Sequence, residues 1–202
     1  MNDYCIALNL DLKMFNSDLH PVDAIKSLPE WSDPRFTSPR GNKHIRVPRE
    51  FLNEELIDFF KNRGIHLIRV EVFYTVPRGS NIIHSDVTTL GDVAKINWVY
   101  GGDGSKMEWY QPNSTYNPEV KSGTTTKTNS PTLNFSKTEV DLVHEQLVQS
   151  PSIVQAGCPH NMINGSTERI CISTIFENIE TRQRLTIAEA IERFKEYLVP
   201  CP

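Results

Sequence analysis

The sequence predicts a mainly β protein: a closed or sandwiched antiparallel sheet such as a jelly roll, with flanking helices that cover one outer face. Three observations predict this class. Short segments rich in β-branched and aromatic residues follow one another between residues 65 and 176, separated by Gly, Pro, Asn and Ser. One helical segment precedes them and another follows. The chain of 202 residues is long enough for one domain with a sizeable core.

The predicted strands are IHLIRVEVFYTV (65–76), VAKINWVYG (93–101), KMEWYQ (106–111), TLNFS (132–136), SIVQAG (152–157) and ERICISTIF (168–176). Residues 136–148 are ambiguous. Ser136 and Glu139 resemble the capping box of a helix, whereas Val140 and Leu142 alternate as they would in a strand. We predict a strand, because the segment lies between strands with little loop.

Two helices are expected, over 48–64 and 186–199. The first begins at Pro48, is acidic in its early part and ends at Gly64. The second has apolar residues at helical spacing and stops before Pro200. Prolines and a glycine within 31–48 predict an irregular segment. One domain, 1–202, would thus comprise a helical and irregular part (1–64), a jelly-roll core (65–176) and a C-terminal helix (186–199).

The charge and composition of the chain argue against some classes of binding partner. The net charge is −4 without a long block of one sign, which argues against nucleic acid and anionic membranes. No apolar run is long enough to span a membrane and no signal peptide is seen, so a cytoplasmic protein is expected. Its four scattered cysteines are expected to be reduced thiols. The polar segment 111–131 is expected to be either a mobile lid or a surface loop.

The stretch NIIHSDVTTLG places His84 and Asp86 two residues apart at the end of a predicted strand. On a strand such residues point to the same side, so both could bind one metal ion, although a solvated turn pair would look the same. His160, before the turn INGSTER, offers a third ligand. Two histidines and one carboxylate form the facial triad of non-haem Fe(II) oxygenases, and their nitrogen and oxygen atoms suit Fe(II).

Arg169 follows that turn and shares a strand face with Cys171 and Ser173. If the alternate face, which carries isoleucines, packs outward, Arg169 points inward and needs an anionic partner. A carboxylate of a bound small molecule fits the planar guanidinium. The alternatives are a pair with Glu108, Glu139 or Asp141, or a position on the surface.

The order and spacing of His84, Asp86, His160 and Arg169 resemble those of the iron(II)- and 2-oxoglutarate-dependent dioxygenases, whose pattern is HxD…H followed by a basic residue. The resemblance covers residues 65–176. The stretch PHNMINGSTERICIST is most similar to the aspartyl/asparaginyl and prolyl hydroxylase branches. The resemblance implies a double-stranded β-helix, Fe(II) bound by His84, Asp86 and His160, and 2-oxoglutarate bound by Arg169. It also implies hydroxylation by O₂ of a small-molecule or peptide substrate, with release of succinate and CO₂.

Many family members place a hydroxyl two residues after this arginine, where this chain has Cys171. Ser173 or Tyr74 could supply the hydroxyl instead. Asn97 lies on a predicted inward face, where it could contact 2-oxoglutarate or substrate, or be an ordinary core residue.

Trp109 and Tyr110, beside the polar segment, are candidate substrate-binding residues. Two other functions compete with the oxygenase. A cupin-like metalloenzyme could use the same triad without 2-oxoglutarate, and a jelly-roll binding module would need no metal. Arg169 favours the oxygenase over the cupin-like metalloenzyme, and the complete triad favours either enzyme over the binding module.

Overall fold

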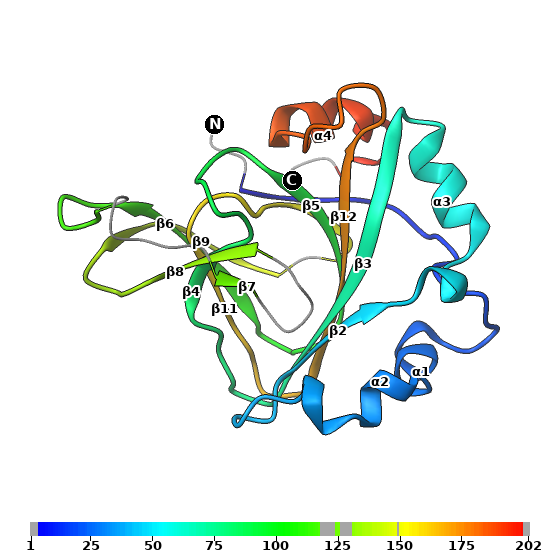
Figure 1. The fold of residues 1–202 in the computed structure, drawn as a ribbon, viewed down its shortest axis with the longest axis horizontal. Helices are drawn as coiled ribbons and strands as arrows, with labels where there is room; N and C mark the ends of the chain where they lie inside the picture. Colours follow the sequence, from blue (N-terminus) through cyan, green and yellow to red (C-terminus); the bar gives the residue numbers. More distant parts are fainter. Residues whose placement is uncertain (1–3, 118–123, 126–130, 149, 200–202) are drawn as a thin grey trace.

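Two antiparallel six-stranded sheets face each other in the computed structural model, which describes residues 4–117, 124–125, 131–148 and 150–199 (Figure 1). The first sheet contains, in spatial order, β1 (Cys5–Ala7), β10 (Ser152–Gln155), β5 (Ala94–Gly101), β12 (Arg169–Asn178), β3 (Ile65–Thr75) and β2 (Lys43–Val47). The second contains β7 (Thr124–Thr125), β8 (Pro131–Phe135), β4 (Ile83–Ser85), β11 (His160–Ile163), β6 (Lys106–Pro112) and β9 (Val140–Leu147). The predicted jelly roll is therefore confirmed, as is the strand predicted within 136–148.

The helices lie on the outer face of the first sheet, away from the second (Figure 1). They are α1 (Pro21–Lys26), α2 (Pro29–Ser32), α3 (Glu54–Lys61) and α4 (Ile187–Arg193), with 3₁₀ turns η1 (Pro34–Phe36), η2 (Arg49–Phe51) and η3 (Lys195–Tyr197). Phe60 of α3 and Phe194, which ends α4, both pack against Phe176 of β12, at ring-centroid distances of 5.6 and 6.3 Å. The main hydrophobic core thus lies between helices and sheet, and the prediction that helices cover one outer face is confirmed.

The N-terminal part differs from expectation at two places. Residues 31–48 are not wholly irregular, because Lys43–Val47 form β2, with Ile45 and Val47 buried in the main core. The prolines that suggested irregular structure flank this strand. The helix expected from Pro48 begins only at Glu54, because the Asn53 side chain accepts a hydrogen bond from the Glu55 amide and caps it there.

Alternation along the central strands β5 and β12 places polar side chains in the space between the two sheets. On β12, Ile170 and Ile172 join the main core, whereas Arg169, Cys171 and Ser173 line a cavity between the sheets. On β5, likewise, Ile96 and Trp98 are core residues, and the neighbouring Lys95 and Asn97 line that cavity. The predicted inward direction of Arg169 and Asn97 is therefore what the structure shows.

Within the described ranges, the helices are too short and too polar to cross a membrane. Residues 118–123 and 126–130 of the polar segment 111–131 lie outside the described residues. The expected lid or surface loop therefore stays a prediction.

Candidate metal centre

Two strands of the second sheet place His84 and His160 side by side. The strands β4 and β11 are antiparallel, and His84 lies directly opposite His160 in their register. Directly opposed residues share a face of the sheet, and the two imidazole centroids are 4.5 Å apart. Asp86 follows β4, where its backbone N–H donates to the carbonyl of Ala156 at 2.9 Å. Residues 84–86 thus lie beside His160, although the two are far apart in sequence.

Backbone carbonyls fix the tautomer of both imidazoles. Nδ1 of His84 lies 2.9 Å from the Ile82 carbonyl, and Nδ1 of His160 lies 2.9 Å from the Cys158 carbonyl. Because a carbonyl only accepts, each Nδ1 carries the hydrogen of the neutral ring and each Nε2 keeps its lone pair. Carbonyl-anchored imidazoles of this kind are typical of metal ligands.

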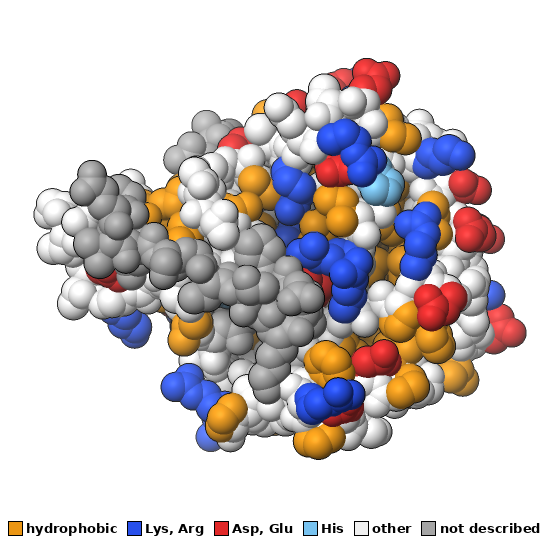
Figure 2. Space-filling view, in the orientation of Figure 1, with side chains coloured by type: hydrophobic (Ala, Val, Ile, Leu, Met, Phe, Trp, Pro, Cys, Tyr) orange, Lys and Arg blue, Asp and Glu red, His pale blue; other side chains and the backbone are white. Residues whose placement is uncertain are grey.

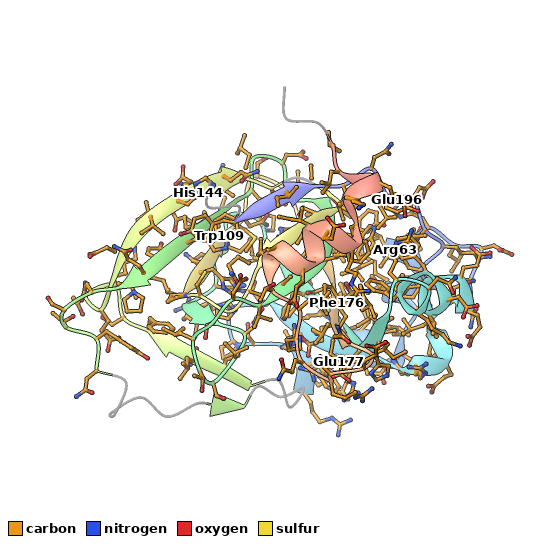
Figure 3. The ribbon with its side chains drawn as sticks, turned by 90° about the horizontal axis from the view of Figure 1, so that it is seen from above. Arg63, Trp109, His144, Phe176, Glu177 and Glu196 are labelled. Carbon is orange, nitrogen blue, oxygen red and sulfur yellow. The ribbon has the colours of Figure 1, made fainter. Side chains whose placement is uncertain are left out.

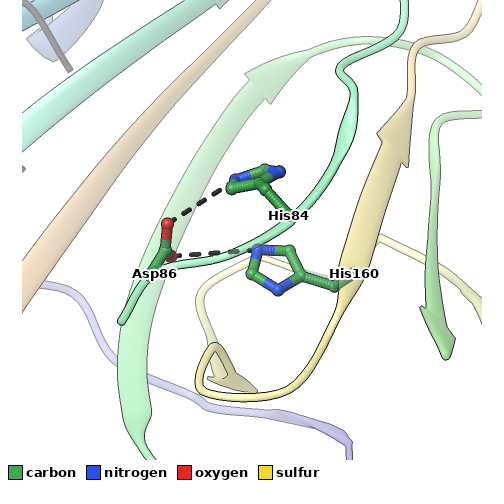
Figure 4. A group of neighbouring side chains, drawn as sticks. All are labelled: His84, Asp86 and His160. Atoms are coloured by element: carbon green, nitrogen blue, oxygen red, sulfur yellow. Dashed lines mark ion pairs between the residues drawn. The ribbon is translucent and has the colours of Figure 1, made fainter. Parts of the chain in front are cut away.

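The free nitrogens converge on the carboxylate, as Figure 4 shows. Nε2 of His84 is 3.5 Å from Oδ1 of Asp86, and Nε2 of His160 is 3.8 Å from Oδ2. All three ligand atoms lie within 4.8 Å of one another. Neighbouring ligands of one transition-metal ion are about 3 Å apart, so small side-chain movements would let the three atoms bind one ion. The arrangement fits the predicted facial triad, with its remaining positions open to a ligand.

Electrostatics favour the protonation states that a metal requires at Asp86 and at His160. Burial alone would raise the pKa of Asp86, but the Lys95 ammonium, the hydrogen bond with His84 and the charge of His160 hold that pKa well below its usual range. Burial and the neighbouring charge of His84 lower the pKa of His160 to about 4. Burial opposes protonation of His84, but its hydrogen bond to Asp86, the charge of Asp86 and its contact with the Ile82 carbonyl together outweigh this and raise its pKa. Asp86 is therefore ionised and His160 neutral near pH 7.

Lys95, which was not predicted as a site residue, is part of this site. Its side chain is only 5 % exposed, and its Nζ lies 2.8 Å from Oδ2 of Asp86. The strand alternation that places Asn97 inward places Lys95 inward as well, which was the available signal. Its ammonium partly neutralises a carboxylate that would otherwise be buried between two histidines.

Replacing Lys95 with methionine is expected to tighten Fe(II) binding about tenfold or more, since the ammonium repels a cation at Asp86. Anaerobic calorimetric titration with Fe(II) would measure the change. The control is Lys106→Met, because Lys106 pairs with Glu108 and Glu145 on the second sheet, away from the triad. Weaker binding in Lys95→Met would show instead that the ammonium orients Asp86 for the metal.

An inner cavity of about 50 Å³ adjoins the triad and is lined by Arg169, Asn97, Cys171 and Ser173 as well as by Lys95. Arg169 is 3 % exposed, and neither its Nε nor Oδ1 of Asn97 has a hydrogen-bond partner among the described residues. Asn97 lies opposite Ser173 in the register of β5 and β12. These unpartnered polar atoms make the cavity suited to a polar ligand.

None of the acids considered as internal partners for Arg169 reaches it. Glu108 binds Tyr110 and Lys106, Asp141 accepts from Asn113, and Glu139 accepts from the Ser136 amide. No ion pair joins Arg169 to any acid in the described part of the chain. A buried guanidinium without an acidic partner is costly, so the position favours a bound anion.

A larger outer cavity, about 500 Å³ in volume, reaches the same centre. Phe73, Asn81, His84 and Asp86 line both cavities. The metal centre therefore lies where a roomy, partly aromatic cavity narrows into a small, polar one.

Three predicted site residues do not line the inner cavity beside Arg169. Tyr74 shares a strand face with Ile170, its partner in register, and its hydroxyl donates to Glu168, so it does not assist Arg169. Trp109 is fully buried, donates to the Gln155 carbonyl and packs beside His144 (Figure 3). The hydroxyl of Tyr110 donates to Glu108. Tyr74 lines the rim of the outer cavity, whereas neither Trp109 nor Tyr110 lines either cavity.

No family model and no curated protein matches the chain. Among solved structures, oxalate oxidase in complex with the substrate analogue glycolate aligns with a TM-score of 0.37 and 14% identity, covering 93% of this chain and 79% of that one. Peruvianin-I, a cysteine peptidase from Thevetia peruviana latex, aligns at 0.35 and 13%, covering 93% and 95%. The vicilin from Solanum melongena aligns at 0.38 and 14%, covering 88% and 44%. Likenesses this distant carry no inference about function.

Proposed function

We propose that this chain is an Fe(II)- and 2-oxoglutarate-dependent oxygenase that hydroxylates a peptide side chain or a small amino-acid-like substrate. The reaction would consume one O₂ and one 2-oxoglutarate for each C–H bond converted to C–OH, and would release succinate and CO₂. The cytoplasm, a reducing compartment that keeps Fe(II) and thiols reduced, is the proposed location.

One observation carries the proposal: the three converging ligand atoms stand beside a buried arginine that has no acidic partner in the described structure. Iron and 2-oxoglutarate, when bound, supply the oxidising chemistry. The protein would position the metal and the 2-oxoglutarate. His84, Asp86 and His160 would hold the metal, and Arg169 would hold the distal carboxylate of 2-oxoglutarate.

The remaining residues bind and orient. Asn97 and Ser173, which lie opposite each other in the register of β5 and β12, offer hydrogen-bonding groups to a ligand in the inner cavity that Arg169 also lines. The outer cavity would admit the substrate, with Phe73 forming an apolar wall beside the metal. Burial of His160 and of the inner cavity would limit the access of bulk water to the inner side of the metal centre.

The deciding experiment is an anaerobic titration of metal-free protein with Fe(II) and then 2-oxoglutarate, observed by visible absorption. A charge-transfer band that requires both additions supports the proposal. The same titration on Arg169→Ala tests the assigned anchor. Absence of any Fe(II) binding would instead leave a jelly-roll binding module.

The small volume of the inner cavity favours a second candidate, a cupin-like metalloenzyme that does not use 2-oxoglutarate. About 50 Å³ is room for only one or two water molecules, so a five-carbon diacid requires Lys95 or its neighbours to move. A smaller acid would need less rearrangement. Tight Fe(II) binding without the 2-oxoglutarate band would favour this candidate.

Replacing Cys171 with serine is expected to tighten 2-oxoglutarate binding about threefold, because a hydroxyl forms stronger hydrogen bonds than a thiol. Burial raises the pKa of the Cys171 thiol, so it remains a neutral, weak donor beside Arg169. The dissociation constant from the anaerobic titration measures the effect. Cys158→Ser is the matched control, since Cys158 does not line the inner cavity. Weaker binding in Cys171→Ser would mean that the thiol serves packing alone.

A further inference from the structure

A second groove, about 360 Å³ in volume, lies next to the outer cavity. We call it the basic groove, because Arg46, Arg49 and Arg69 line it. Phe36 lines both the basic groove and the outer cavity, so the two adjoin. Figure 2 shows Lys and Arg side chains gathered over this face of β2 and β3. A ligand that enters the outer cavity can therefore extend into a basic surface.

The positive charge here is a local exception to an acidic chain. The protein has a net charge of −4, yet residues 34–49 contain five Lys and Arg residues and no Asp or Glu. Arg46 and Arg49 are exposed, and neither forms an ion pair with an acid in the described part of the chain. Arg69 bonds to Glu71, and Glu30 is the one acid among the described residues that line the groove. Cations therefore outnumber acids in the groove.

The shape and the walls of the groove favour a peptide. Together the two cavities are far larger than a free amino acid needs, and an extended chain advances about 3.3 Å per residue. Val47, Leu52 and Leu67 give the groove apolar walls, and Phe36 is its one aromatic side chain among the described lining residues. Single-stranded nucleic acid is usually bound on several stacked aromatic rings, so a groove with one aromatic side chain among its described lining residues favours a peptide.

We propose that the substrate is an acidic peptide, with the side chain to be hydroxylated in the outer cavity and a neighbouring Asp or Glu bound by Arg46 and Arg49. The identification of the outer cavity as the substrate site rests on the proposed function. The basic groove then acts as a specificity subsite, which selects peptides by charge rather than by the residue that reacts.

Two fluorescein-labelled peptides test this, Gly-Glu-Glu-Gly-Asn-Gly-Glu-Glu-Gly and its counterpart with Gln in place of every Glu. Fluorescence anisotropy at low and at physiological ionic strength measures their affinities. The acidic peptide is expected to bind about tenfold or more tightly than the Gln peptide, and salt is expected to weaken this preference.

The double variant Arg46→Glu/Arg49→Glu should lose the preference for the acidic peptide. The variant Arg46→Gln/Arg49→Gln replaces it if the charge reversal impairs folding. The double variant Lys61→Glu/Lys137→Glu is the matched control, because it also reverses two positive charges, at the exposed end of α3 and on the exposed turn between β8 and β9.

Equal affinity for the two peptides, or an unchanged preference in the double variant, would overturn the proposal. Tighter binding of a twelve-residue oligothymidylate than of the acidic peptide would assign the groove to nucleic acid instead. Anisotropy needs no turnover, so this inference and the proposed function can fail separately. Charge-selective binding without the 2-oxoglutarate band would leave a peptide-binding groove on a protein of another activity. The band without charge-selective binding would leave an oxygenase whose substrate is not acidic.

Discussion

Replacing Asp86 with alanine is expected to abolish Fe(II) binding and also to lower the free energy of unfolding of the metal-free protein by about 3 kcal/mol. The first effect follows because both imidazoles converge on this carboxylate. The second follows because the ammonium of Lys95, 2.8 Å from Asp86, would remain buried without an acid. Calorimetric Fe(II) titration and urea unfolding of the metal-free protein measure the two effects independently.

A double variant separates the two roles of Asp86. Asp86→Ala combined with Lys95→Met removes both charges, so it should recover most of the lost stability without recovering metal binding. Asp86→Ala that binds Fe(II) as tightly as the wild type would exclude Asp86 as a ligand. A double variant that stays as unstable as Asp86→Ala would show that the pair with Lys95 is not the source of the loss.

Replacing Arg169 with alanine is expected to weaken 2-oxoglutarate binding by at least about thirtyfold while Fe(II) still binds, since truncating one partner of a buried charge pair costs about 2 kcal/mol or more. Lysine at this position should give an intermediate loss, because it keeps the charge and lacks the planar fork. Anaerobic titration with 2-oxoglutarate after Fe(II) saturation provides the measurement. Unchanged affinity in Arg169→Ala would refute the assignment of Arg169 as the anchor.

The burial of Arg169 leads to a further prediction, about the stability of the ligand-free protein. Arg169 is buried, and no acid in the described structure pairs with it. Arg169→Met should therefore unfold at the same or a higher urea concentration than the wild type, in contrast to most buried substitutions. A large loss of stability would indicate that the guanidinium has a structural partner.

The sequence could predict those parts of the site that depend on local geometry. His84 and Asp86 lie together because residues two apart on a strand share a side, and the isoleucines of β12 indicate which face of that strand carries Arg169. His160, which precedes the turn INGSTER, was predicted as a third ligand, and its spacing resembles that of a family pattern. The pairing of His84 with His160 in register is what the structure adds to that pattern.

Contacts between strands that are distant in sequence could not be predicted in the same way. The pair formed by Lys95 and Asp86 joins β5 of one sheet to the segment after β4 of the other, so it depends on how the sheets face each other. Tyr74 lies on the opposite strand face from Phe73, which reaches the metal centre, and only the register with β12 shows this. The sequence could not show whether Trp109 is a core residue or lines a pocket, because buried aromatic side chains occur in both places.

The separation of the main hydrophobic core from the polar space between the sheets has a consequence for how such a protein can diversify. Residues that hold the fold together, such as Phe60, Phe176 and Phe194, pack between helices and sheet, on the other face from Arg169, Cys171 and Ser173. Substitutions of cavity residues other than Asp86 thus leave the main hydrophobic core intact. Because most mutations are lost through unfolding rather than through altered chemistry, this scaffold should tolerate broad mutagenesis of its cavity walls. It is therefore a favourable starting point for laboratory evolution toward new substrates.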